Sequence, residues 1–186
     1  MEKPRSEDYE LIDRFLSGEE LAFEILVRKY QNRVINIVYS LCGATQHAED
    51  IAQETFIKVH RSLKDFQKKA AFSTWLYRIT VNTAYNYLKG KNRFVALEHI
   101  EKAQEFEKIS LDHIESKERQ RLISKAIENL PFVYRTVVVL KDIEGLAYAD
   151  IAKTVGCSIG TVESRLFRAR QILKKTLAPL LEEGRR

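Results

Sequence analysis

Residues 146–175 read LAYADIAKTVGCSIGTVESRLFRARQILKK and predict a helix, a sharp turn and a second helix. The turn contains Gly156, a residue that favours the left-handed backbone with which many helices end. Ser158 follows, and its hydroxyl can cap the N-terminus of the second helix. In that helix, apolar residues recur at spacings of four, three and four, which predicts one buried stripe made of Val162, Leu166, Ala169 and Leu173.

This pattern is typical of a helix-turn-helix. Two helices that meet near a right angle need a small contact residue, a tight turn and an inserted aliphatic side chain, and Ala152, Gly156 and Val162 supply them. The second helix would then face the major groove, where arginine can grip guanine with two hydrogen bonds. Its exposed residues at this face are Glu163, Ser164, Arg165, Phe167 and Arg168. An ordinary helical hairpin with a solvated basic face is the alternative.

Length and composition indicate a globular helical protein. The 186 residues are 45% hydrophobic and 31% charged, which suits one or two small domains with real cores. Only seven Gly and three Pro interrupt the chain, so an all-α fold is expected. Cys42 and Cys157 lie far apart and lack partners at metal spacing, so we expect no disulfide framework, metal site or cofactor. No apolar run approaches the ~20 residues of a membrane helix, and the N-terminus is too charged for a signal peptide, so we expect a cytoplasmic protein without membrane insertion.

The charge alternates in blocks along the chain. The net charge is +5, but residues 66–97 carry six basic and no acidic side chains, whereas residues 98–118 carry seven acidic and three basic ones. This predicts two positive surfaces, each suited to nucleic acid, on either side of a negative connection. We therefore expect two small helical domains, 1–95 and 119–186, joined by a flexible acidic linker at 96–118.

Apolar periodicity locates the other helices. They are expected at 9–15, 19–42, 47–59, 72–93, 119–130 and 134–144. The run Val137-Val138-Val139 favours a strand by propensity, but its position between two helices and the spacing of its apolar residues favour a helix.

An acidic face is expected on the helix at 47–59. Asp50 and Glu54 are four residues apart and therefore share a face. Three interpretations remain open: a metal site that includes Glu49, a solvated surface, or a docking face for a basic partner.

The helix at 72–93 combines aromatic rings with basic and amide side chains. Ser73 can cap it, and Leu76, Ile79, Thr83 and Tyr87 form the expected core stripe. Exposed positions are expected to be Trp75, Tyr77, Arg78, Asn82, Tyr85, Asn86 and Lys89. Such a surface suits stacking on unpaired bases while cations hold phosphates. The alternative is a plain basic helical domain whose aromatic residues belong to the core.

Four collinear motifs together resemble the extracytoplasmic-function (ECF) subgroup of RNA polymerase sigma factors, most closely the sigma-E type. They are AEDIAQETFIKVHRSL (48–63), FSTWLYRITVNTAYNYL (72–88), ENLPFVYRTVVVLKDIEGLAYADIA (128–152) and GTVESRLFRAR (160–170). The match covers nearly the whole chain outside the linker and the tails.

The resemblance implies a stress-response transcription factor that binds core RNA polymerase and promoter DNA and is not itself an enzyme. It assigns polymerase docking to Asp50, Gln53, Glu54 and Phe56. It assigns minus-ten recognition and melting to the first domain, through Lys68, Lys69, Trp75, Arg78, Asn82, Asn86 and Lys89. The minus-thirty-five reader would be the Glu163 to Arg168 set. An anti-sigma factor is an expected partner. Glu163 departs from the family pattern, because a basic residue is more usual there and a carboxylate accepts from cytosine N4 but repels phosphate.

Two rival hypotheses remain. A helix-turn-helix activator or repressor that senses a ligand would bind duplex DNA tightly without polymerase. A metal-dependent nuclease would use Glu49, Asp50 and Glu54 and would cleave DNA in the presence of magnesium.

Overall fold

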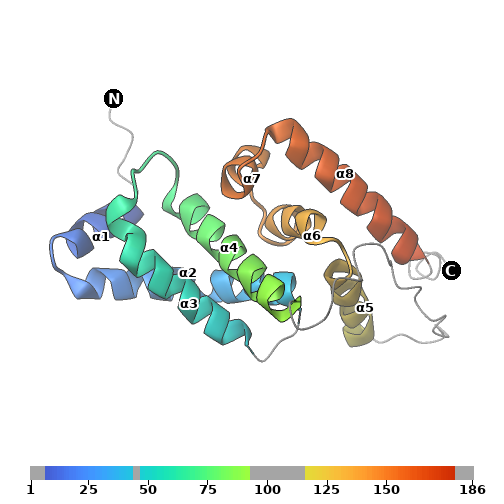
Figure 1. Cartoon of the computed structure of the whole chain (residues 1–186), viewed down its shortest axis with the longest axis horizontal. Coiled ribbons are helices and arrows are strands. Elements are labelled where there is room, and N and C mark those ends of the chain that lie inside the picture. Colours follow the sequence, from blue (N-terminus) through green and yellow to red (C-terminus); the bar gives the residue numbers. More distant parts are fainter. Residues whose placement is uncertain (1–6, 44–46, 93–115, 179–186) are drawn as a thin grey trace.

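The computed structural model describes residues 7–43, 47–92 and 116–178. All regular secondary structure within these residues is helical, which confirms the predicted all-α fold (Figure 1). The helices form two groups, one from each end of the chain. Across the described ranges, no helix combines the length and the apolar character needed to span a membrane.

The N-terminal group is organised around its long second helix. Its members are α1 (Glu7–Leu16), α2 (Glu20–Cys42), α3 (Ala48–Ser62), a 3-10 turn (Leu63–Asp65) and α4 (Phe72–Asn92). Apolar side chains of α2 recur every three or four residues, so they form one buried stripe that includes Leu26, Tyr30, Val34, Ile37 and Leu41. Helices α1, α3 and α4 all pack against α2.

The cap predicted for α4 is wrong, although the helix starts at the expected residue. The backbone N–H of Trp75 donates to the carbonyl of Ala71 at 3.2 Å, so the helix already begins at Phe72. Ser73, the predicted cap, therefore lies inside the first turn.

The C-terminal group contains the helix-turn-helix. Its members are α5 (Ser116–Glu128), α6 (Phe132–Val138), a π-helical turn (Val139–Ile143), α7 (Tyr148–Val155) and α8 (Ile159–Thr176). The valine run is helical as predicted, and Val137, Val138 and Val139 are all buried. Helix α5 begins inside the predicted linker, and residues 96–115, the rest of that prediction, lie outside the described residues.

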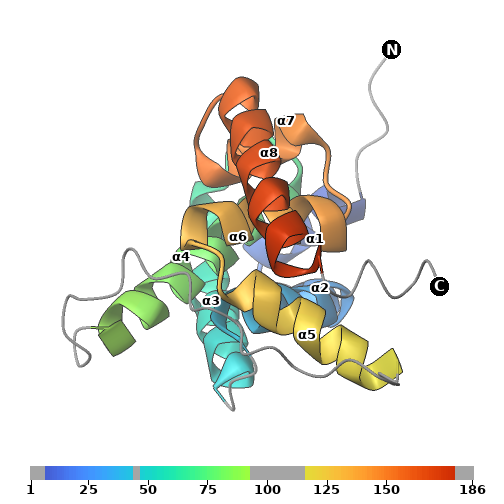
Figure 2. The same ribbon diagram turned by 90° about the vertical axis from the view of Figure 1, so that its right-hand side faces the viewer.

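The two groups lie directly against one another. Figures 1 and 2 show α7 next to α4, and α5 and α6 next to α2, and residue contacts join the same pairs. Arg135 of α6 crosses the boundary, because its guanidinium donates to the carbonyl of Leu41 at the end of α2 as well as to the carbonyls of Glu128 and Leu130. The buried side chains of both groups consequently form one continuous core.

Candidate nucleic-acid interface

The turn between α7 and α8 has the geometry that its sequence predicts. Gly156 ends α7 in the left-handed region, with φ 69° and ψ 41°. Ser158 caps α8, and its hydroxyl oxygen accepts from the N–H of Thr161 at 3.1 Å. Three residues of the predicted stripe on α8, Val162, Leu166 and Ala169, are buried, so the opposite face of the helix is fixed toward solvent.

That solvent-facing surface carries the predicted groove-reading side chains, called here the upstream reader: Glu163, Ser164, Arg165, Phe167 and Arg168. Phe167 is 66% exposed, an unusual placement for a large apolar ring in a folded domain. Arg165 and Arg168 form no ion pair within the described part of the chain. Arg170 differs, because a hydrogen bond to Asp142 at 2.6 Å holds it against the domain and raises its pKa.

The second predicted surface is a stripe along α4. Its members, called here the base-reading stripe, are Trp75, Arg78, Asn82, Asn86 and Lys89. They follow one another at spacings of three, four, four and three and therefore share one side of the helix. The last four are exposed, whereas Trp75 is half-buried against Phe66 and Phe72, with ring centroids 5.1 and 6.0 Å away.

Two exposures predicted for α4 are wrong, that of Trp75, which is half-buried as described above, and that of Tyr77. Tyr77 is buried, at 1% exposure, rather than exposed, because it lies near Arg33 of α2 and Glu144 of the C-terminal group, and burial raises the pKa of its phenol. Lys68 is exposed as expected but is not free. Its ammonium forms an ion pair with Asp13 and lies 5.8 Å from the centre of the Tyr9 ring.

Two hollows border the base-reading stripe. The larger, of about 450 Å³, lies between the loop before α4 and the start of α4, and its lining includes Phe66, Lys69, Trp75 and Arg78. Lys153 of α7 also lines it. The smaller, of about 260 Å³, lies between α3 and α4 and is lined by Lys58, Ser62, Ile79, Asn82, Thr83 and Asn86.

Lys58 lines the smaller hollow and was not among the predicted site residues. Its ammonium lies 2.7 Å from Glu54 on its own helix and within 3.3 Å of the hydroxyl of Thr83 on α4. In the sequence, Lys58 follows Glu54 by four residues, which predicts only an ion pair within one helix. No feature of the neighbouring sequence indicates that Lys58 lies beside Asn82 and Asn86 of another helix.

The acidic face of α3 is present as predicted. Asp50, Gln53 and Glu54 are exposed and Phe56 is half-buried. Among the described residues, no group of three His, Cys, Asp or Glu side chains is placed to hold a metal ion.

Exposed apolar side chains on α2 and α3 were not among the predicted site residues. Ile57 of α3 is 50% exposed, and Leu21 and Ile25 of α2 are 65% and 43% exposed. A shallow hollow of about 230 Å³ lies here, lined by Phe23, Phe56, Ile57, His60 and Arg61. A signal did exist, because Leu21 and Ile25 lie off the buried stripe of α2 and so add apolar surface that the core does not need. We call the acidic and apolar residues together the docking face: Leu21, Ile25, Asp50, Gln53, Glu54, Phe56 and Ile57.

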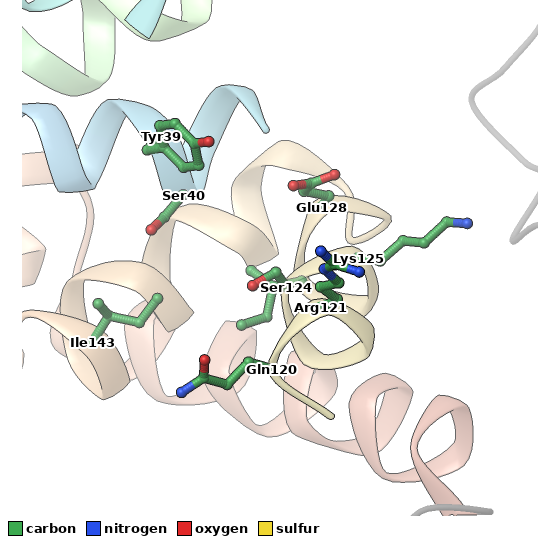
Figure 3. Close-up of a pocket in the computed structure, with 9 residues that line it drawn as sticks. Tyr39, Ser40, Gln120, Arg121, Ser124, Lys125, Glu128 and Ile143 are labelled. Carbon is green, nitrogen blue, oxygen red and sulfur yellow. The ribbon is translucent and has the colours of Figure 1, made fainter. Parts of the chain in front are cut away.

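A further cleft of about 580 Å³ lies between the two groups. Figure 3 shows Tyr39 and Ser40 of α2 on one side and Gln120, Arg121, Ser124, Lys125 and Glu128 of α5 on the other, with Ile143 at the edge. It holds none of the predicted site residues.

Comparison with known proteins identifies both groups of helices. Residues 26–94 match the family model of sigma-70 region 2, and residues 120–173 match that of sigma-70 region 4. The RNA polymerase sigma-H factor of Pseudomonas aeruginosa is 41% identical over 97% of this chain and 98% of its own length. The ECF RNA polymerase sigma-E factor of Haemophilus influenzae is 38% identical over 94% and 97%.

Solved structures share the fold. The chain is similar to CnrH in its complex with the cytosolic domain of CnrY, with a TM-score of 0.71 and 24% identity over 94% of this chain and 99% of that one. It is also similar to the sigma factor RpoE of Bartonella quintana, in a complex with the anti-sigma factor NepR, with a TM-score of 0.65 and 24% identity over 84% and 96%. With both regions matched and its full-length relatives named as sigma factors, the chain belongs to the ECF group of the sigma-70 family of RNA polymerase sigma factors.

Proposed function

We propose that this sigma factor directs promoter-specific transcription initiation through three separate surfaces: the upstream reader, the base-reading stripe and the docking face. The observation that carries the proposal is the presence, on one chain, of an exposed recognition helix and of a stripe in which exposed basic and amide side chains follow the half-buried Trp75. A duplex reader together with a single-strand reader suits a protein that both locates and opens a promoter.

The upstream reader recognises the minus-thirty-five element in duplex DNA. Arg165 and Arg168 are free of ion pairs in the described residues and can donate to guanine O6 and N7 or to phosphate. Phe167 can lie against thymine methyl groups, which accounts for its exposure in the free protein. Glu163 adds an acceptor suited to cytosine N4, so the preferred upstream element includes a cytosine contact that a basic residue would not make.

The base-reading stripe acts on the minus-ten region after the strands part. Trp75 and Arg78 line the 450 Å³ hollow, which is large enough for an unstacked base, while Lys69 stands at the same site to hold its phosphate. Asn82 and Asn86 border the second hollow and offer amide donors and acceptors to a further unpaired base edge. Lys89 adds a further positive charge to the stripe. Lys68 binds phosphate once its ion pair with Asp13 is broken.

The docking face binds core RNA polymerase. Its exposed carboxylates favour a basic partner surface, and its apolar neighbours supply area whose burial is favourable. The hollow lined by Phe23 of α2 and by Phe56 and Ile57 of α3 lies on the helix that carries these carboxylates, and such a combination of apolar and polar groups suits a protein interface.

The remaining functional expectations follow from the family. The chain acts in the cytoplasm with polymerase, catalyses no step itself and is controlled by an anti-sigma factor, as the RpoE relative is bound by one in its complex.

Reconstituted transcription tests the proposal. The purified chain, mixed with core RNA polymerase, is expected to co-purify with it and to initiate from a defined set of promoters in a genomic DNA library. The chain alone is expected to bind duplex DNA weakly and without strong sequence preference. Tight specific duplex binding by the free chain, with no dependence on polymerase, would support the activator or repressor hypothesis instead.

A further inference from the structure

One wall of the larger hollow beside α4 is a loop. Residues 66–71, called here the entry loop, connect the 3-10 turn to α4 and belong to no helix. Four of them line the hollow: Phe66, Gln67, Lys69 and Ala70. Lys68, which lies between them, has a φ of 54°, a left-handed backbone that residues with a side chain rarely adopt. Such a conformation persists where neighbouring groups hold it, so contacts from outside the loop are expected to fix the shape of the hollow.

Helix α1 supplies contacts of this kind. The hydroxyl of Tyr9 donates to the carbonyl of Ala70 at 3.2 Å, and the Tyr9 ring lies 6.1 Å from the ring of Phe66. Asp13, one helical turn further along the same face, forms an ion pair with Lys68. These three contacts reach the first residue, the middle and nearly the last residue of the entry loop.

Helix α1 is itself held firmly on α2. Asp8 is only 8% exposed, and its carboxylate accepts hydrogen bonds from Lys29 and from the hydroxyl of Tyr30, both at 2.7 Å. Leu11 and Ile12 are buried in the core. Hydrogen bonds to a buried charge are costly to break, so α1 is a rigid support for the loop. The helix lies before the segment that matches sigma-70 region 2, and none of its residues belongs to the three surfaces proposed above.

Tyr9 contacts the wall of the hollow without lining the hollow itself. Phe66, its ring partner, packs against Trp75 with ring centroids 5.1 Å apart and against Phe72 at 5.9 Å. A displacement of Phe66 would therefore change the wall that faces Trp75, where the unpaired base is proposed to enter.

The two contacting residues of α1 differ in what strand binding does to their contacts. Phosphate can replace the carboxylate of Asp13 as the partner of Lys68, whereas the contacts of Tyr9 involve no charged group and persist. We propose that Tyr9 is a positioning residue for minus-ten reading. It holds the entry loop in the conformation that forms the hollow, so α1 determines how sharply the hollow distinguishes bases. This inference rests on the minus-ten assignment made above.

Base preference, measured position by position, tests this role. The holoenzyme transcribes a promoter library in which each base of the melted region is varied in turn. Trp75→Ala and Arg78→Ala identify the position that the larger hollow reads, as the one at which preference is lost. Tyr9→Ala is expected to lose preference at that same position. It should keep the preference that Asn82→Ala removes, because the smaller hollow is lined only by α3 and α4.

Two further variants separate positioning from a general loss of stability. Tyr9→Phe keeps the packed ring and removes only the hydrogen bond to Ala70, so a smaller loss at the same position is expected. Glu10→Ala, at an exposed position of α1, is the matched control and should keep every preference.

A tether provides the rescue. Cys42 and Cys157 are first replaced by Ala, and Tyr9→Cys and Ala70→Cys are then introduced and joined with a short, reducible bis-thiol reagent. The joined factor is expected to recover the base preference that the reduced protein lacks, because the tether fixes the loop on α1 without the tyrosine. The reduced protein is the matched control.

The outcomes separate the inference from its basis. If Tyr9→Ala keeps the wild-type preference at the position read by the larger hollow, or lowers preference equally at both positions, the inference fails while the minus-ten site stands. A tether that restores no preference leads to the same conclusion. If Trp75→Ala and Arg78→Ala change no preference, the minus-ten assignment fails, and the inference fails with it.

Discussion

Arg168 and Arg170 lie two residues apart on α8 but differ in their contacts. Arg170 is fixed by Asp142, whereas Arg168 is exposed and has no ion pair in the described residues. A long side chain without an internal partner loses least when it turns to DNA, because no existing hydrogen bond must be broken. Arg168 is therefore the better residue with which to separate base reading from phosphate contact.

We expect Arg168→Ala to cost about 1–3 kcal/mol of binding at one upstream base position and to relax preference there, if the side chain grips a base edge. Transcription from a promoter library with each upstream base varied measures this. Arg170→Ala is the matched control and should leave the base preference unchanged. A uniform loss over all sequences from Arg168→Ala, with the salt slope lowered by about one, would show a phosphate contact instead.

The double change Asn82→Ala with Asn86→Ala should impair promoter opening. The amides can match the edge of an unpaired base, and that capture offsets the few kcal/mol needed to unstack it. Permanganate footprinting of thymines with the holoenzyme is expected to show weaker reactivity in the melted region. A template already mismatched over those bases should recover the melting component, and any remaining loss reports base reading. Wild-type reactivity in the double variant would reduce both residues to a solvated face.

Individual residues could be predicted from sequence where their role is local. The stripe on α4 follows from helical spacing alone, and the cap at Ser158 follows from a hydroxyl residue directly before the helix. Tyr77 could not be placed correctly, because the groups near it, such as Arg33, come from distant positions. The ion pair of Lys68 with Asp13 could not be predicted for the same reason. Helical periodicity shows which side chains share a face but not what covers that face.

At the scale of elements, α3 combines a buried side with the exposed side that we propose binds polymerase. Reversing Asp50 and Glu54 to Lys should weaken association with core polymerase. An exposed charge pair contributes about 0.2–1 kcal/mol, and several at a desolvated interface exceed this. A pull-down titration against core polymerase measures the change.

The fold should survive this reversal, because both carboxylates are exposed and the Glu54–Lys58 pair lost with it lies at the surface. Circular dichroism checks that point. Glu10→Lys, the same change of charge at an exposed position of α1, is the control and should leave polymerase affinity as it is. Equal affinity of the double variant and the wild-type factor would remove α3 from the docking face.

The N-terminal cap of α8 allows a test of how much one capping hydrogen bond stabilises the recognition helix. Ser158→Ala removes the hydroxyl that accepts from the N–H of Thr161, and the expected loss is about 0.5–2 kcal/mol in the free energy of unfolding. Urea denaturation measures it. Ser158→Asp keeps an acceptor and should recover most of the loss. If Ala and Asp behave alike, the start of α8 is held by packing rather than by its cap.

The elements themselves could largely be predicted, and the exceptions have physical causes. For the valine run, the spacing of apolar residues predicted a helix although valine favours strands, and the helix is confirmed. The run is buried between helices, so packing outweighs the local propensity. The start of α5 within the predicted linker was missed, since its first residues carry the same mixed charge as the segment before them.

At the scale of the whole molecule, the packing of the two domains was beyond sequence reasoning. Charge blocks indicate two positive surfaces and a negative connection, but they do not show whether the surfaces face each other. The contacts that close the molecule use a backbone carbonyl at Leu41, a backbone carbonyl at Thr74 and a ring on Tyr85, none of which has a sequence signature.

Glu144 provides a test of the closed molecule through pH. It lies near Arg33 of the other domain, and burial raises the pKa of its carboxyl above the ordinary 4.5, while Arg33 opposes the shift. Because the folded pKa is the higher one, the folded state binds more protons than the unfolded state between the two values. The carboxylate therefore destabilises the fold fully above its raised pKa, and this cost disappears as the pH falls below about 4.5.

Glu144→Gln should consequently raise the thermal unfolding temperature at neutral pH and have progressively less effect in acid. Thermal scans of the full chain from neutral pH to below 4.5 measure the difference between variant and wild type. Glu163→Gln, which removes an exposed carboxylate on α8, is the control and should show no such trend. A Glu144→Gln variant that is less stable than wild type at neutral pH would mean that attraction to Arg33 outweighs desolvation. Glu144 would then act as an electrostatic clasp between the domains, and its neutralisation would open the molecule.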